Sequence, residues 1–515
     1  MSSFPWLTVL GLVPLVGAAL VLAAPPSRPA AGKAVALVTT LVTLGLTIAM
    51  ATQFRAHGGF QFRQSYEWIP QFGVRYSVGI DGIALVLIGL TAVLLPVVVL
   101  ASWQEAESGR RSVPTFFALL LVLETMMFGV FAATDVFLFY VFFEAMLVPM
   151  YFLIGSYGGP RRQYAAVKFL LYSLFGGLLM LAAVIGLYVI SVRHGTGTFD
   201  FQSLVRLDIS PGVQKALFLG FFIAFAIKAP LVPFHTWLPD AGAEAPTGGA
   251  VLLVGVLDKV GTFGFIRYCL PLFPDAARAF APYVLALAVI GILYGALLAM
   301  GQNDLKRLVA YTSVAHFGFI ALGIFAFTSQ GGAGAVLYMV NHGLSTGALF
   351  LIVGFMISRR RTRLISAYGG VARSAPLLAG AFLLAGLSSL SLPGLNTFVS
   401  EFLVLVGTFT RHRAYAILAT VGIVLAALYI LLMYQRTMHG PTAEPNLRLP
   451  DLSMREVLVI APVLALIVAL GVYPKPVLDV ITPSVNRTLQ EIHRSDPAPT
   501  VPGAAAGLPV RIAGK

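Results

Sequence analysis

Apolar residues dominate this chain in long, nearly uninterrupted stretches that are separated by short polar connections. A helix needs about 20 apolar residues to cross a bilayer, and about fourteen stretches reach that length. They centre near residues 14, 43, 90, 123, 145, 178, 224, 257, 290, 316, 345, 393, 424 and 464. The pattern therefore predicts an all-α, polytopic membrane protein with about fourteen transmembrane helices.

The spans leave no room for a separate soluble domain. We divide the chain into helices 1–3 (residues 1–113), helices 4–8 (114–270), helices 9–13 (271–435), and a linker, helix 14 and flexible tail (436–515). We expect the longer polar connections at 55–79 and 191–215 to lie at the membrane surface. The Pro/Ala/Gly-rich tail from Pro474 onward is expected to be only partly ordered.

Composition supports this class and excludes others. The chain is 58% hydrophobic and only 11% charged, which no soluble protein of 515 residues matches. The net charge of +13 does not indicate nucleic-acid binding, because the basic residues are spread over the connections between spans. The lone Cys269 excludes an internal disulfide and a cysteine-held cluster.

Two of the predicted spans are interrupted. The seventh contains Pro230 and Pro233, and the twelfth contains Pro393 followed by Gly394. Proline removes a helical hydrogen bond, and unpaired backbone at membrane depth is tolerated only inside protein or beside a wet cavity. Breaks at corresponding places in two halves predict inverted repeats, here helices 4–8 and 9–13. The alternative is a pair of unrelated packing kinks.

Four charged residues lie deep within apolar stretches: Glu144, Lys228, Lys259 and Glu401. A charge at mid-bilayer costs about 2.5–3.5 kcal/mol by insertion scales, so such residues usually face the protein interior and mark ion or proton pathways. The set therefore favours a proton path.

The energy of a buried Glu–Lys contact is comparable to the cost of moving a proton across the membrane, which supports that interpretation. At about 4 Å and an effective dielectric constant of about 20, one Glu–Lys contact is worth about 4 kcal/mol. Moving one proton against about 150 mV costs about 3.5 kcal/mol. The free energy of a Glu–Lys contact that opens and closes is therefore large enough to drive the movement of one proton. The alternative is a static buried ion pair that holds two helices together.

Further titratable residues lie in or beside the spans. His235, His316 and His342 would suit a proton relay, because imidazole titrates near neutral pH. Glu124 and Asp258 are ambiguous, and Lys168 lies near a helix start, where snorkelling to the surface explains it. Asp258 need not pair with Lys259, because neighbours on a helix point about 100° apart. We find no Cys/His metal spacing and no nucleotide-binding glycine loop, so no metal or cofactor is expected.

Several motifs resemble those of the antiporter-like, proton-pumping subunits of respiratory complex I. They are Ala133-Thr134-Asp135 with Phe143-Glu144 and Pro149 to Gly155, His235 to Ala241 with Glu244 to Thr247, Asp304 to Ser313 with His316, and His342-Gly343-Leu344. Within the family the resemblance is strongest to the M branch of bacterial NADH:quinone oxidoreductase. The sister branches L and N typically carry a lysine where Glu401 stands.

The resemblance implies fourteen helices with inverted five-helix repeats, and it implies residue roles. Glu144 would pair with Lys228, and Lys259 would be the central proton carrier. His316 and His342 would extend the relay, with Glu401 at the exit side. This chain departs from the family where Gly242 and Ala243 replace a common His-Thr pair, and where Asp258 replaces a usual leucine.

The expected function is proton translocation as a membrane-arm subunit, driven by quinone reduction elsewhere in the complex. Expected partners are the bilayer and the other membrane and peripheral subunits, including sister antiporter-like subunits, in a bacterial plasma membrane. One alternative is a subunit of a cation/proton antiporter or a membrane-bound hydrogenase-type complex. Another is a static membrane spacer whose buried charges never titrate.

Overall fold

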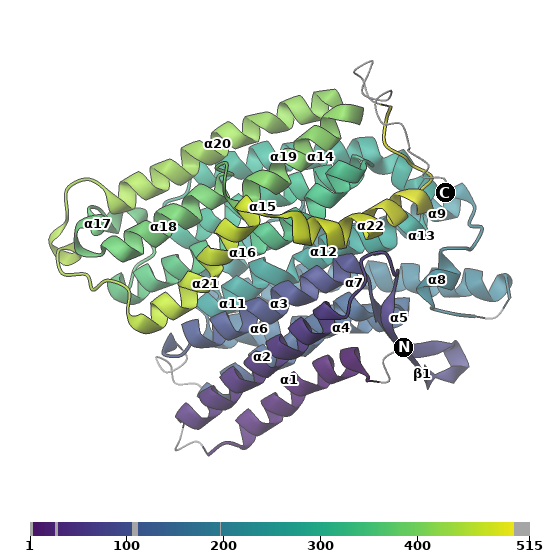
Figure 1. Ribbon diagram of the computed structural model, residues 1–515, viewed down its shortest axis with the longest axis horizontal. Coiled ribbons are helices and arrows are strands. Elements are labelled where there is room, and N and C mark those ends of the chain that lie inside the picture. The colour runs from purple at the N-terminus through teal and green to yellow at the C-terminus, as the bar shows by residue number, and fades with distance from the viewer. Residues whose placement is uncertain (1–3, 26–28, 106–111, 196, 499–515) are drawn as a thin grey trace, which may run out of the picture.

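The computed structural model describes residues 4–25, 29–105, 112–195 and 197–498. Within them, 13 helical segments are long and apolar enough to cross a membrane, and Pro376–Ser389 is a shorter apolar helix. Most of the long helices run alongside one another (Figure 1). The predicted class, a helical multi-span membrane protein, is confirmed.

The elements follow the predicted spans in order. The first half contains α1 (Trp6–Ala23), α2 (Pro29–Thr52), strands β1 (Gln61–Ile69) and β2 (Val74–Ile80), α3 (Gly82–Ala101), α4 (Val113–Ala132), α5 (Val136–Ala145), α6 (Leu147–Tyr157), α7 (Arg162–Arg193), α8 (Phe201–Leu204), α9 (Pro211–Lys228), α10 (Trp237–Glu244), α11 (Thr247–Leu252), α12 (Lys259–Gly264) and α13 (Leu270–Leu272). The second half contains α14 (Pro274–Met300), α15 (Leu305–Phe325), α16 (Ser329–Arg360), α17 (Val371–Ser374), α18 (Pro376–Ser389), α19 (Asn396–Arg411), α20 (Arg413–Met438), α21 (Met454–Val472) and α22 (Lys475–Glu491). Short 3₁₀ turns cover Pro70–Phe72, Ile365–Ala367 and Glu444–Asn446.

Burial separates an inner set of spans from an outer set. The most apolar window of Thr247–Leu272 is wholly buried, and those of α15 and α16 are nearly so. Only a third of the corresponding windows of α1 and α2 is buried. Leucine and valine side chains are exposed along α1, α2, α7, α20 and α21, which is where lipid tails would cover them.

Both predicted interruptions are present. Span 7 is broken between α9 and α10, and span 12 between α18 and α19. Two further irregularities were not predicted. Span 5 is interrupted at Met146, where Pro149 lacks the N–H that would bond the carbonyl of Ala145. Span 8 contains two π-helical turns, Leu253–Leu257 and Phe265–Cys269.

The connections hold more structure than the sequence indicated. The segment after α2 forms an antiparallel hairpin in which Tyr66 pairs with Tyr76. Its turn ends at Gly73, whose φ of +65° is a conformation that favours glycine. The expectation of a partly ordered tail from Pro474 is wrong for its first part, because α22 forms there and packs on α3 and α16. Residues 499–515 lie outside the described residues.

Candidate functional site

Eight polar side chains form a line through the interior, which we call the buried row. In spatial order they are Glu144 (α5), Lys228 (α9), Asp258 (just before α12), Lys259 (first residue of α12), His342 (α16), His316 (α15), Tyr338 (α16) and Glu401 (α19). Each member interacts with the next through a hydrogen bond, a ring contact or an electrostatic interaction. The row therefore joins both halves of the chain.

Lys259 is the best-connected member. Its Nζ lies 2.6 Å from Nδ1 of His342 and 3.2 Å from Oδ1 of Asp258, and it donates to the carbonyl of Val254. An ammonium group has three N–H donors, so these three contacts satisfy it. Because Nδ1 of His342 must then accept, a charged Lys259 leaves the His342 proton on Nε2.

The geometry of span 8 explains this arrangement. The π-helical turn Leu253–Leu257 is followed directly by Asp258, and α12 begins at Lys259 itself. Such turns often occur at functional sites. Helix geometry does not require Asp258 to pair with Lys259, but the two side chains do meet in the structure, because the flexible lysine side chain folds back to its neighbour. The second carboxylate oxygen, Oδ2, has no hydrogen-bond partner among the described residues.

The row continues through two histidines and a tyrosine. The rings of His342 and His316 are 5.2 Å apart between centroids, and that of Tyr338 lies 5.8 Å from His316. The Tyr338 hydroxyl donates to Oε2 of Glu401 at 2.8 Å. Sequence reasoning missed Tyr338, because an aromatic residue in an apolar span is usually packing. The available signal was its position four residues before His342, on the same face of α16.

Glu401 is held by the break in span 12. Ser391, in that break, donates to the same carboxylate oxygen at 2.6 Å. Asn396, at the first turn of α19, exchanges hydrogen bonds with Asn341 of α16 and accepts one from Ser388 at 2.6 Å. These contacts satisfy polar groups that a broken helix leaves at membrane depth. They also fix α19, and with it Glu401, against α16.

The other end of the row is looser. The expected direct pair of Glu144 and Lys228 is not present: no ion pair within 4.0 Å joins them in the described residues, although they interact electrostatically. Nζ of Lys228 has no hydrogen-bond partner there and lies 4.8 Å from the ring centroid of Phe143. Glu144 is half-buried rather than buried, and Val148 of the adjacent α6 is exposed.

Four further candidates were named from the sequence: Glu124, Lys168, His235 and Asp258. Only Asp258 belongs to the buried row. Lys168 does not snorkel, because its Nζ forms an ion pair with Asp240 at 2.7 Å. His235 is buried in the break of span 7 and packs edge-on to Tyr294. Glu124 is wholly buried in α4, and no hydrogen bond joins either of its oxygens to the row or to another described residue.

Two acids of the seventh-span motif hold the structure together. Asp240 binds Lys168 of α7 and Arg307 of α15, the latter at 2.6 Å. Glu244 binds Arg363, which follows α16, at 3.1 Å. These ion pairs tie α10 to both halves of the chain, so the motif has a structural role that the sequence did not reveal. Over the described ranges, no group of three or more His, Cys, Asp or Glu side chains is placed to hold a metal ion.

Comparison with known proteins gives consistent results. A family model described as NADH:quinone oxidoreductase/Mrp antiporter, TM, matches residues 133–426. NADH-quinone oxidoreductase subunit M of Mycobacterium tuberculosis is 52% identical, and the match covers 97% of each chain. The subunit M of Rhodobacter capsulatus is 40% identical over 95% of this chain and 97% of that protein.

Solved structures agree. A chain of respiratory complex I from Thermus thermophilus with bound NADH aligns with a TM-score of 0.86 and 33% identity, over 94% of this chain and 99% of that chain. The Mrp complex from a Dietzia species has the same fold at 20% identity, with a TM-score of 0.85 over 96% of this chain and all of that chain. By the extent and identity of these matches, the chain belongs to the NADH-quinone oxidoreductase subunit M family of antiporter-like membrane subunits.

Proposed function

We propose that this chain translocates protons along the buried row as a membrane-arm subunit of an NADH:quinone oxidoreductase, driven by quinone reduction elsewhere in that complex. The observation that carries the proposal is that buried side chains link Lys228 to Glu401, with the half-buried Glu144 at the other end of the row. A packed membrane spacer gains nothing from so many desolvated titratable groups, because burying charge is costly. The expected partners of this chain are the redox module and sister membrane subunits.

Unsatisfied polar atoms indicate how protons would pass between members of the row. Lys228 Nζ, Asp258 Oδ2, His342 Nε2 and both ring nitrogens of His316 have no hydrogen-bond partner in the described residues. Buried polar groups are normally satisfied by protein or by ordered water. We propose that water molecules join these groups into a continuous path.

In the proposed mechanism, Lys228 is the residue that changes its partner. Lys228 would alternate between the Glu144 side and the Asp258 side, since its ammonium interacts electrostatically with both carboxyl groups. Each alternation would change the charge environment of Lys259 through Asp258, and so bias proton release toward His342. The breaks in spans 7 and 12 also support our proposal that helices 4–8 and 9–13 are inverted repeats.

The test is NADH-driven acidification in membrane vesicles, with assembly of the complex checked by native gel. Lys228→Met keeps an unbranched apolar side chain one atom shorter and removes the charge, so we expect strongly reduced acidification with an assembled complex. Lys215→Met is the matched control, because Lys215 is an exposed lysine at the start of the same helix, α9. Wild-type acidification by an assembled Lys228→Met complex would refute the proposed role and favour a static spacer.

A further inference from the structure

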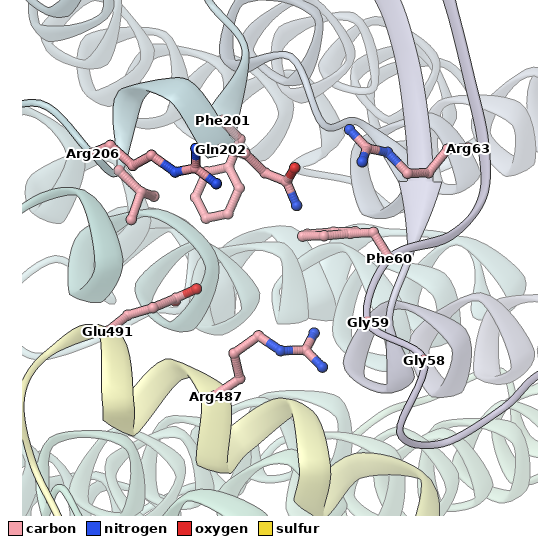
Figure 2. A pocket seen from close by; sticks show the side chains of 10 residues that line it. Gly58, Gly59, Phe60, Arg63, Phe201, Gln202, Arg206, Arg487 and Glu491 are labelled. Carbon is pink, nitrogen blue, oxygen red and sulfur yellow. The ribbon is translucent and has the colours of Figure 1, made fainter.

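A cavity of about 380 Å³ opens at the end of the molecule where strand β1 of the hairpin lies (Figure 1). Three segments that are far apart in the sequence meet around it: the loop leading into β1, the short helix α8, and the C-terminal helix α22 (Figure 2). Its volume falls within the range of about 300–1,000 Å³ that is typical of small-ligand sites. None of its lining residues belongs to the proposed proton path.

The lining carries an excess of positive charge. Arg63, Arg206 and Arg487 extend toward the cavity from three sides in Figure 2. None of the three side chains forms a hydrogen bond or an ion pair within 4.0 Å to a described residue. Glu491 is the one acidic residue in the lining. Three guanidinium groups thus face one carboxyl group, and no residue in the described part of the chain holds them by a hydrogen bond or an ion pair.

A fourth cation packs against aromatic rings that line the cavity. The guanidinium of Arg267 packs 4.7 Å from the ring centroid of Phe60 and 5.9 Å from that of Phe201, and both rings line the cavity. Arg267 is already paired with Asp81 at 2.6 Å. Burial raises the pKa of Glu491, against the opposing influence of Arg267 and Arg487. The single acid is therefore an incomplete counterion for the arginines around the cavity.

The chemistry of the lining fits one class of ligand. Guanidinium groups bind phosphate oxygens through paired, charge-assisted hydrogen bonds, and several arginines around one cavity are suited to a phosphate group. The exposed amide of Gln202 adds a polar group, and the phenyl rings of Phe60 and Phe201 form an apolar floor. We propose that this arginine pocket binds a phosphate group.

The position of the pocket favours a phospholipid as the source of that phosphate. Its lining begins shortly after α2 ends at Thr52, and Arg206 lies shortly before α9 begins at Pro211. Those spans end where a bilayer has its headgroups. Basic pockets beside transmembrane helices are suited to anionic lipid headgroups. Free inorganic phosphate offers the same oxygens without the acyl chains, so the test separates the two sources.

The test uses cryo-electron microscopy of the assembled complex in three preparations. One has phosphatidylglycerol nanodiscs without inorganic phosphate, one has phosphatidylcholine nanodiscs without inorganic phosphate, and one adds saturating inorganic phosphate to the phosphatidylcholine nanodiscs. Each is repeated with the triple variant Arg63→Gln, Arg206→Gln, Arg487→Gln. The control variant Arg373→Gln, Arg436→Gln, Arg448→Gln removes the same charge from exposed arginines outside the cavity.

For the wild type and the control variant, we expect headgroup density among the three arginines, continuous with acyl chains, in the nanodisc preparations without inorganic phosphate. The triple variant should lose it, and the single variant Arg206→Gln should weaken it if the triple variant fails to assemble. Compact density that requires added inorganic phosphate would identify free phosphate as the ligand. An empty cavity in all three preparations, a neighbouring subunit's acidic side chain within it, or density that persists in the triple variant would overturn the proposal.

Discussion

The two ends of the buried row are built in different ways. Direct hydrogen bonds join Lys259 to Asp258 and to His342. Direct hydrogen bonds also join the carboxylate of Glu401 to Tyr338 and Ser391. Around Glu144 and Lys228 there is no direct contact between the two charges, and the glutamate is half-buried. One end is preassembled, whereas the other holds two opposite charges apart.

That difference assigns the two ends different tasks. Buried groups that are held by direct hydrogen bonds have little freedom to move, and they lose much when one partner is removed. An ammonium without a partner, next to a carboxylate at the edge of the protein, can change partners at little structural cost. We infer that control of the pathway lies at the Glu144 end and that conduction lies at the Lys259 end.

The largest effect is expected at Lys259. Lys259→Met would leave Asp258 buried without its cation, which costs about 3–5 kcal/mol and should lower the yield of assembled complex. The double variant Lys259→Met, Asp258→Leu removes the orphaned carboxylate and should restore assembly, as seen on a native gel, while acidification stays absent. An assembled double variant that pumps like the wild type would show that Lys259 is dispensable.

The next effect concerns the hydroxyl that sequence reasoning missed. Tyr338→Phe keeps the ring but removes a hydrogen bond to a carboxylate, worth about 1.5–3 kcal/mol. If that bond lies on the path, acidification should slow by about tenfold, since about 1.4 kcal/mol corresponds to a factor of ten in rate. Tyr429→Phe is the matched control.

Tyr429 is also buried near Glu401, but its hydroxyl has no hydrogen-bond partner in the described residues. Its replacement should leave acidification close to wild type. Equal losses in Tyr338→Phe and Tyr429→Phe would mean that the effect comes from packing and not from the hydrogen bond.

The smallest effect is expected at the looser end. A methyl group added at Gly177 of α7 would meet the carboxylate of Glu144. The half-buried side chain can shift, so Gly177→Ala should reduce acidification only about fivefold, which corresponds to about 1 kcal/mol. On the same helix, Gly186→Ala meets only the end of the Leu217 side chain and serves as control. A complete loss in Gly177→Ala would indicate that the Glu144 end is as rigid as the other.

The sequence was sufficient for the spans, the two proline breaks and most of the row. Apolar length and proline act locally, so Pro230 and Pro393 marked the breaks without knowledge of the fold. Contacts that depend on packing could not be found in this way. The π-helical turn that brings Lys259 onto Asp258 and the separation of Glu144 from Lys228 are set by neighbouring helices. The roles of Asp240 and Glu244 likewise required knowledge of which cations lie opposite them.

In the proposed path, protons leave the row through Glu401. Glu401→Gln keeps an acceptor for the hydroxyls of Tyr338 and Ser391, but it cannot ionise. The decisive measurement is the number of protons translocated per NADH oxidised in vesicles that contain the assembled Glu401→Gln complex, compared with wild type across neutral pH. We predict a lower ratio for the variant, with partial recovery in Glu401→Asp. An unchanged ratio in Glu401→Gln at every pH would contradict a titrating role for this residue.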